Sequence, residues 1–438
     1  MPGARLAYLT QRLESLLAVA NFGASSTFWL ATAFLISVDD YGRLMTLQAA
    51  ILLLVAAFTL RTHDLVYFLT VSHGTSLARA WRAGLAMETL AATLCLTAGL
   101  ATIFIIVPGR FADPEGSAIF LAVATAVVAQ QASIARIRRS GRAVLIRATD
   151  GFILVLWSGA LLYLLLGFDR DREQLLILGA LPQAVRTLLL VGSAALVRDA
   201  EADNRTATPW AAVVRYVIGG QAVNFIKNGA TSIETSILAA FIAPAPVALY
   251  RLTKSTQGIV TAFSNVVFQQ GTDALSSARD VEHRSDLLRQ LRTRGLRGAL
   301  AAYPFSVIFA LVYAYVKPDV SAVEFQLVMA FSFIALLPQI LLQGSFIVIS
   351  LAGKQVTINL IYLISTVALV VLSGALFVYP SIWVFLAALT GANVARLILL
   401  DRVARQVLPS LSARGDQPRP MLDQPEDVAE PAYGVRAS

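Results

Sequence analysis

Twelve apolar stretches run along the chain, separated by short polar joints. A helix needs about 20 mostly apolar residues to cross the hydrocarbon core of a bilayer, and the stretches have about that length or more. They predict an all-α membrane protein with about 12 transmembrane helices. The expected spans are 13–36, 44–60, 84–107, 117–135, 149–167, 175–197, 211–242, 249–269, 296–316, 322–350, 356–378 and 381–400.

Basic residues gather in every second joint, after the even-numbered spans. They are Arg79, Arg82, Arg136, Arg138, Arg139, Arg142, Arg147, Arg198, Arg205, Arg279, Arg284, Arg289, Arg292, Arg294, Arg297, Lys354, Arg402 and Arg405. The joints between them are acidic or nearly neutral. Because Lys and Arg in short loops resist translocation, the pattern predicts a multi-pass protein of a bacterial inner (plasma) membrane with both termini cytoplasmic.

Composition supports this class, with 57% hydrophobic and 14% charged residues. The net charge of +8 is explained by cytoplasmic loops that face anionic lipid, so no nucleic-acid partner is expected. The single cysteine, Cys95, lies inside the third predicted span, and the three histidines share no spacing typical of a metal site. We therefore expect no metal, no cofactor and, with no soluble domain left over, no enzyme.

Short similar segments suggest an internal duplication. Residues 23–26 (Gly-Ala-Ser-Ser) open one segment and residues 229–232 (Gly-Ala-Thr-Ser) open another, and similar residues follow in both. The segments would place spans one and seven at equivalent positions of two parallel six-helix halves; chance similarity of small residues is the alternative. The predicted domains are residues 1–200, residues 201–409 and a disordered cytoplasmic tail at 410–438.

Three motifs carry a resemblance to a known family. Residues 233–235 (Ile-Glu-Thr) precede an apolar run, residues 248–251 (Ala-Leu-Tyr-Arg) open the eighth span, and residues 268–270 (Phe-Gln-Gln) close it. With twelve spans in six-plus-six order, the chain resembles the polysaccharide and lipid-linked oligosaccharide flippases of the multidrug/oligosaccharidyl-lipid/polysaccharide (MOP) exporter superfamily. The resemblance implies a MATE-like fold, with two six-helix lobes around a central cavity that opens alternately to either side.

Ionisable and amide side chains inside the seventh and eighth spans are the candidate substrate-binding residues, because such groups are costly in a bilayer and usually face a polar interior. Cations would hold a pyrophosphate and amides would bind sugar hydroxyls. The candidates are Arg215, Gln221, Asn224, Lys227, Asn228, Glu234, Arg251, Lys254 and Gln257.

Structural roles compete with these assignments. Arg251 and Lys254 can snorkel to an interface, and Lys227 and Glu234 can pair with each other or with other helices to stabilise packing. Glu88, in the third span, is a candidate for ion coupling, with a packing partner for a nearby Arg or Ser as the alternative.

Translocation of lipid-linked oligosaccharide, a precursor of O-antigen or exopolysaccharide type, by alternating access is the favoured function. Polysaccharide polymerase and glycosyltransferase partners fit it. A cation-coupled multidrug exporter of the MATE type is the first alternative, although the basic seventh and eighth spans disfavour cationic drugs. A membrane polysaccharide polymerase or ligase is the second, although no external joint is long enough for its catalytic loop.

Overall fold

The computed structural model describes residues 17, 20–21, 23–72, 74–106, 114–167, 171–197, 210–258, 281–352 and 354–412. For some residues in these ranges it describes the backbone alone. The joint at 198–209, the motif at 268–270 and the tail beyond residue 412 lie outside the described residues. The described chain is helical apart from short joints, as the sequence predicts.

The first group of helices, here called the N group, comprises the helical residues 23–35 and the helices up to residue 195. Its named helices are α2 (Val38–Phe58), α3 (Thr62–Ser72), α4 (Leu77–Ala101), α5 (Pro114–Thr125), α6 (Gln131–Arg139), α7 (Ala143–Leu165) and α8 (Arg172–Ala195). A π-helical turn at Thr102–Ile106 extends α4, and a 3₁₀ turn at Ala126–Gln130 joins α5 to α6.

The second group, here called the C group, comprises the helical residues 244–258 and the last four helices. These are α11 (Val281–Val316), α12 (Ala322–Leu351), α13 (Gln355–Ser373) with a 3₁₀ turn at Gly374–Phe377, and α14 (Ile382–Ser412). Between the two groups in sequence lies α9 (Trp210–Phe241), which packs along α2 and also contacts α3 and α13.

Nine stretches within the described residues are long and apolar enough to cross a membrane. They correspond to the second to sixth and the ninth to twelfth predicted spans. Residues of the first, seventh and eighth predicted spans are also helical wherever the structure describes them.

Several predicted boundaries are wrong; the twelfth span, for example, was expected to end at residue 400, but α14 continues to Ser412. Two other differences bear on the site and on the membrane. The second span was expected to end at residue 60, but the chain bends at 59–61 and continues as α3, so the candidate span runs over Val38–Thr70. The ninth span was expected to begin at residue 296, but α11 already begins at Val281. At about 1.5 Å per residue its 36 residues exceed the ~30 Å hydrocarbon core, so its basic first turns extend the helix beyond the core.

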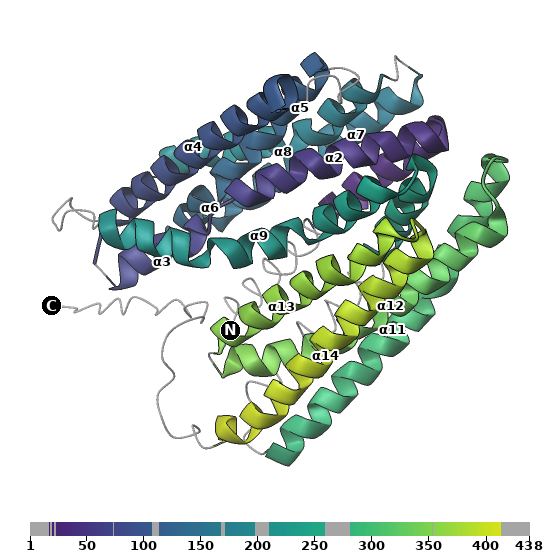
Figure 1. The fold of residues 1–438 in the computed structure, drawn as a ribbon. Coiled ribbons are helices and arrows are strands. Elements are labelled where there is room, and N and C mark those ends of the chain that lie inside the picture. Colours follow the sequence, from purple (N-terminus) through teal and green to yellow (C-terminus); the bar gives the residue numbers. More distant parts are fainter. Residues whose placement is uncertain are drawn as a thin grey trace, which may run out of the picture.

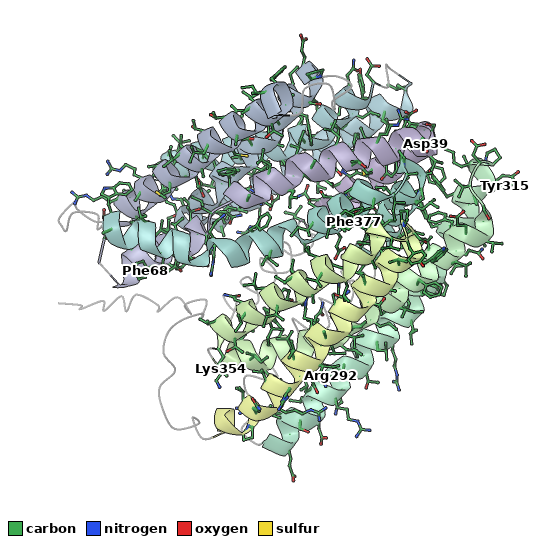
Figure 2. All side chains as sticks on the ribbon, viewed as in Figure 1. Asp39, Phe68, Arg292, Tyr315, Lys354 and Phe377 are labelled. Carbon is green, nitrogen blue, oxygen red and sulfur yellow. The ribbon has the colours of Figure 1, made fainter. Side chains whose placement is uncertain are left out.

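Figure 1 shows the two groups meeting at one end and diverging toward the other, where α3 and α14 end. In Figure 2, Arg292 and Lys354 lie toward the diverging end, whereas Asp39 and Tyr315 lie at the end where the groups meet. We call these the basic end and the acidic end. Charge thus separates along the helix axes, as the alternation of basic and acidic joints predicts.

Local chemistry explains two joints. Ser37 caps α2 by accepting a hydrogen bond from the Asp40 amide at 3.1 Å, and Asp39 and Asp40 place negative charge in the first turn, where the helix dipole favours it. Between α5 and α6, Ala129 departs from helical geometry (φ −95°, ψ 33°). This break frees backbone N–H groups at the start of α6, which need other acceptors inside a bilayer.

Candidate functional site between the two helix groups

A buried carboxylate joins α9 to the helix at 244–258. Glu234, 7% exposed, lies on α9, where its Oε2 accepts a hydrogen bond from the Tyr250 hydroxyl at 2.6 Å and pairs with Lys254 Nζ at 2.8 Å. Tyr250 and Lys254 are four residues apart, so they share one helical face and reach the same oxygen together. The structure thus brings Glu234 and Lys254, two of the predicted site residues, into direct contact.

Arg251 crosses from the helix at 244–258 to α2. Its Nη2 donates to Gln48 Oε1 at 3.1 Å and its Nη1 lies 3.5 Å from Thr235 Oγ1, while its Nε is buried without a hydrogen-bond partner in the described chain. No carboxylate of a described residue lies within 4.0 Å of this guanidinium. A half-buried cation held only by neutral groups is unusual, because the cost of desolvating it is not offset by an opposite charge.

A third cation lies further along the same interface. A cavity of about 280 Å³ between α9 and the C group is lined by Ile226, Ala230, Phe346, Tyr362, Thr366 and Arg396. Ile226, Ala230 and Glu234 are spaced four residues apart on α9, so the cavity and the Glu234 pair lie along one face of that helix.

Arg396 was not among the predicted site residues, although a charged residue inside the predicted span 381–400 was a visible signal. Its Nε donates to Ser365 Oγ at 2.8 Å, and its guanidinium lies 4.6 Å from the centre of the Tyr362 ring. Aromatic stacking and a neutral hydroxyl position the group without neutralising it.

The remaining predicted candidates have other surroundings. Gln221 donates to the backbone oxygens of Ala57 (2.7 Å) and Thr59 (3.2 Å). The bend after α2 leaves these carbonyls without helical partners, so this amide is used structurally. Gln257 is buried at 3% exposure. The side chains of Arg215, Asn224, Lys227 and Asn228 lie outside the described part of the chain.

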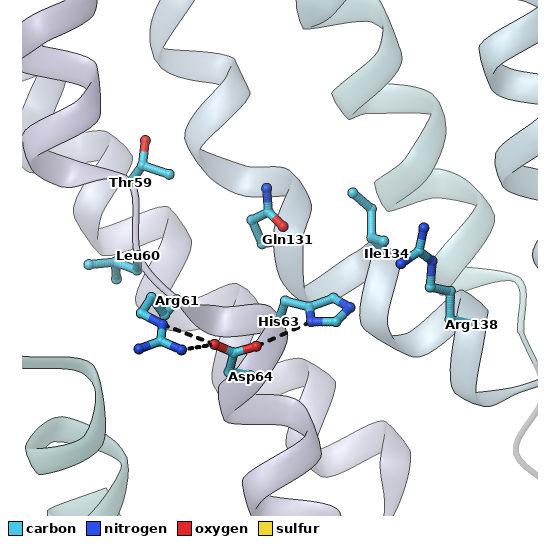
Figure 3. A pocket seen from close by; sticks show the side chains of 8 residues that line it. All are labelled: Thr59, Leu60, Arg61, His63, Asp64, Gln131, Ile134 and Arg138. Carbon is cyan, nitrogen blue, oxygen red and sulfur yellow. Dashed lines mark hydrogen bonds and ion pairs between the residues drawn. The ribbon is translucent and has the colours of Figure 1, made fainter. Parts of the chain in front are cut away.

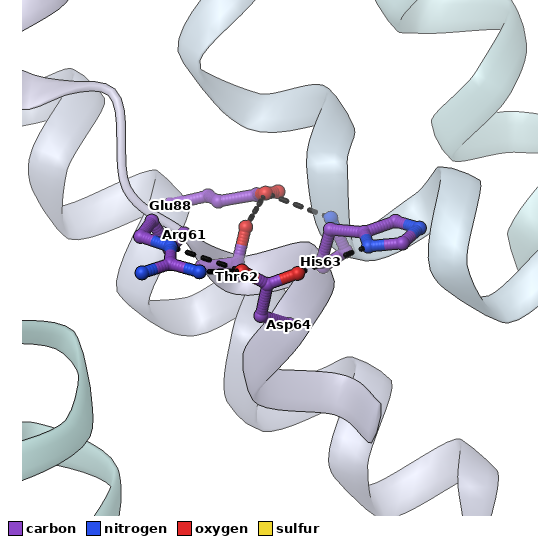
Figure 4. Close-up of polar contacts among 6 residues, drawn as sticks. Arg61, Thr62, His63, Asp64 and Glu88 are labelled. Carbon is purple, nitrogen blue, oxygen red and sulfur yellow. Dashed lines mark hydrogen bonds and ion pairs between the residues drawn. The ribbon is translucent and has the colours of Figure 1, made fainter. Parts of the chain in front are cut away.

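Glu88 occupies a separate polar site within the N group. Its Oε1 accepts hydrogen bonds from the Thr62 hydroxyl of α3 and from the Ala132 amide of α6, the latter at 2.8 Å (Figure 4). The carboxyl group is fully buried, and its Oε2 has no hydrogen-bond partner among the described residues. It therefore ties together the helix starts that follow the two breaks, after α2 and after α5.

A cavity of about 420 Å³ lies beside Glu88, toward the basic end (Figure 3). Its lining includes Arg61, His63 and Asp64, with the Arg61 Nε 2.9 Å from Asp64 Oδ2 and the His63 Nδ1 3.5 Å from Asp64 Oδ1. These polar residues directly follow residue 60, the predicted end of the second span, yet they lie inside the candidate span Val38–Thr70 and line a polar recess.

Arg186 also has its polar partners within the N group. Its Nε lies 2.7 Å from Asp150 Oδ1, and its Nη1 donates to Gln130 Oε1 at 2.9 Å. Arg186 therefore forms an interior ion pair between α7 and α8.

Contacts at the acidic end hold the two groups together. Tyr313 and Lys317 of the C group donate to the backbone oxygens of Ala33 (3.4 Å), in the last turn of the helix at 23–35, and of Ile36 (2.8 Å), just after it. Burial against this helix end lowers the pKa of the Lys317 ammonium, an effect opposed by nearby Asp319. Gly42 of α2 lies so close to the Pro244 backbone that a side chain there would overlap it.

Comparison with protein-family models and with curated protein sequences gives no match. Solved structures do match. An inward-facing multidrug resistance MATE family transporter of the MOP superfamily gives a TM-score of 0.61 at 14% identity, over 90% of this chain and 96% of that one. A MATE in complex with MaL6 gives 0.57 at 15% identity, over 92% and 96%. The chain therefore has a MATE-like fold, and the predicted fold class is confirmed.

Proposed function

We propose that this protein is a membrane transporter that moves a lipid-linked oligosaccharide across the bacterial inner membrane by alternating access. One observation carries the proposal: among the described residues, the site along α9 holds three cations, Arg251, Lys254 and Arg396, and one carboxylate, Glu234. A fourth cation of the interface, Lys317, lies apart from this site, at the acidic end. The site thus carries a net positive charge inside the membrane-spanning region. It suits an anionic head, such as the pyrophosphate that links a glycan to its carrier lipid.

The arrangement of helices supports the transport step. The groups diverge at the basic end, which in this proposal faces the cytoplasm, where lipid-linked glycans are assembled (Figure 1). Translocation requires no covalent chemistry: the protein offers a polar, cationic path to the head while the lipid tail stays in the bilayer. Release on the other side requires the contacts at the acidic end to separate.

Export of cationic drugs is the second candidate, supported by the likeness to MATE structures and by the buried Glu234 carboxylate. In the described structure, however, Lys254 and Tyr250 already occupy this carboxylate. A cationic drug would have to displace an internal ammonium and enter a site with an excess of positive charge.

The test is the sidedness of lipid-linked oligosaccharide in inverted membrane vesicles and spheroplasts, probed with an impermeant glycan-modifying enzyme. We expect the glycan to stay on the cytoplasmic leaflet when the protein is absent and to reach the outer leaflet when it is restored. Arg251→Gln should slow translocation about tenfold or more, the value of one charge-assisted hydrogen bond. Arg289→Gln, on an exposed turn of α11, is the matched control.

The drug-export alternative is tested in the same cells by ethidium accumulation. Protein-dependent ethidium efflux together with unchanged glycan sidedness would replace the present proposal with that alternative.

A further inference from the structure

The cavity beside Arg396 carries features of a ligand site that the fold does not require. A guanidinium in the middle of α14 faces a 280 Å³ cavity, and no carboxylate of a described residue lies within 4.0 Å of it. Replacement of such a residue by an apolar one would remove a desolvation cost without breaking an ion pair. No direct ion pair therefore accounts for a charge at this position, and Glu234 attracts the guanidinium only from a greater distance.

The cavity lining has an apolar part and a polar part. Ile226, Ala230 and Phe346 supply an apolar wall, while Arg396, Tyr362 and Thr366 lie together on the helices α13 and α14. The Nε of Arg396 is held by Ser365, and the Tyr362 ring supports the guanidinium plane. The guanidinium orientation is thus fixed by contacts that leave most of its donors available for a planar or tetrahedral anion.

We propose that this cavity binds the anionic group of an amphiphilic ligand, with Arg396 as the residue that contacts the phosphate and Ile226, Ala230 and Phe346 contacting the adjacent apolar chain. The inference rests on the proposed function and makes it more specific, because it assigns the charged head to α13 and α14 and the first apolar segment to α9 and α12. A free inorganic anion shares the phosphate chemistry but would leave the apolar wall unused.

Binding of radiolabelled farnesyl phosphate to the purified full chain in dodecyl maltoside tests the site, with protein-free micelles giving the partition background. We expect saturable binding that Arg396→Gln weakens about tenfold or more. Arg402→Gln, an exposed position on the same helix with the same charge change, should leave the affinity within about twofold. An equal affinity in the wild type and Arg396→Gln would overturn the assignment.

Competition distinguishes the sources of the anion. Unlabelled farnesyl phosphate should displace the probe, whereas farnesol, which lacks the charge, and inorganic phosphate, which lacks the chain, should do so only at far higher concentration. Equal competition by inorganic phosphate would identify a free-anion site, and equal competition by farnesol an apolar pocket. Either result overturns the proposal.

A second variant does not depend on removing the arginine. Ala230→Leu enlarges an exposed α9 side chain that lines the cavity and changes no charge. We expect it to reduce farnesyl phosphate binding about as strongly as Arg396→Gln, and unchanged binding would contradict the location.

The two proposals fail separately. If Arg396→Gln binds farnesyl phosphate as well as the wild type does, while glycan sidedness still depends on the protein, only the anion site is refuted. If Arg396→Gln weakens binding, while glycan sidedness is the same with and without the protein, only the oligosaccharide as the transported substrate is refuted.

Discussion

Replacement of Gly42 by Ala should drive apart the two helix groups at the acidic end. A Cβ at this position would lie 2.5 Å from the Pro244 carbonyl carbon and 2.9 Å from its Cα, and nearer still to the carbonyl oxygen. Carbon atoms pack at about 3.5 to 4.0 Å, so the backbones must separate by about 1 Å. The opposing atoms belong to the backbone and cannot rotate away.

The expected magnitude follows from the cost of overpacking. Extra atoms in a well-packed contact typically cost about 1 to 3 kcal/mol. If the clash is relieved when the acidic end opens, this cost applies only to the closed state. The ratio of open to closed molecules should then rise by roughly five- to 140-fold, since about 1.4 kcal/mol is a factor of ten.

The assay measures distances between spin labels at Asp39 and Asp319, both exposed at the acidic end. Gly42→Ala should increase the population with a longer distance. Gly151→Ala is the matched control, because a Cβ on this helical glycine would meet no atom within 4 Å, so the distribution should not change. A folded Gly42→Ala protein with the wild-type distribution would contradict this expectation, because local movement of Pro244 would then have absorbed the clash.

Two further predictions concern buried charges of the N group, both read out by thermal unfolding of the full chain in detergent. Glu88→Ala removes the acceptor of the Thr62 hydroxyl and the Ala132 amide, so it should lower the free energy of unfolding by about 2 to 5 kcal/mol. Glu88→Gln keeps an acceptor and should lower the free energy of unfolding by less than half as much. In a transport assay, Glu88→Gln should also abolish any dependence of transport on a proton gradient. Arg186→Met leaves the Asp150 carboxylate without its cation and should cost about 3 to 5 kcal/mol, and adding Asp150→Asn should recover most of that loss; no recovery would show that Arg186 acts through packing alone.

Apolar run length was sufficient to predict the helices, because every residue of a bilayer-spanning segment is constrained by the same solvent. It failed where polar residues interrupt a span. The second span was predicted to end at residue 60, just before Arg61, His63 and Asp64, yet the helix resumes there because these side chains line a polar recess. Hydropathy averages over all faces of a helix and cannot distinguish such a recess from a membrane boundary.

Side-chain partners were less predictable than helices. Pairing of Lys227 and Glu234 with each other or with other helices was the structural alternative from sequence, and Glu234 does pair with Lys254 of the next helix. Gln221 was expected to face sugar hydroxyls, but it bonds two carbonyls released by a bend about 160 residues earlier. Both outcomes depend on which helices become neighbours, and periodicity within one segment carries no information about that.

Arg251 connects the contacts of the closed acidic end with the proposed binding site. In this structure its guanidinium donates to Gln48 of α2, and so helps to join the two groups. A ligand shifts a conformational equilibrium only by the difference in its affinity for the two states. If an anionic head takes hydrogen bonds from Arg251, it competes with Gln48, and the contact with α2 weakens as the ligand binds. Loading of the site from the basic end would then itself favour opening at the acidic end, so the proposed transporter would need no separate sensor of occupancy.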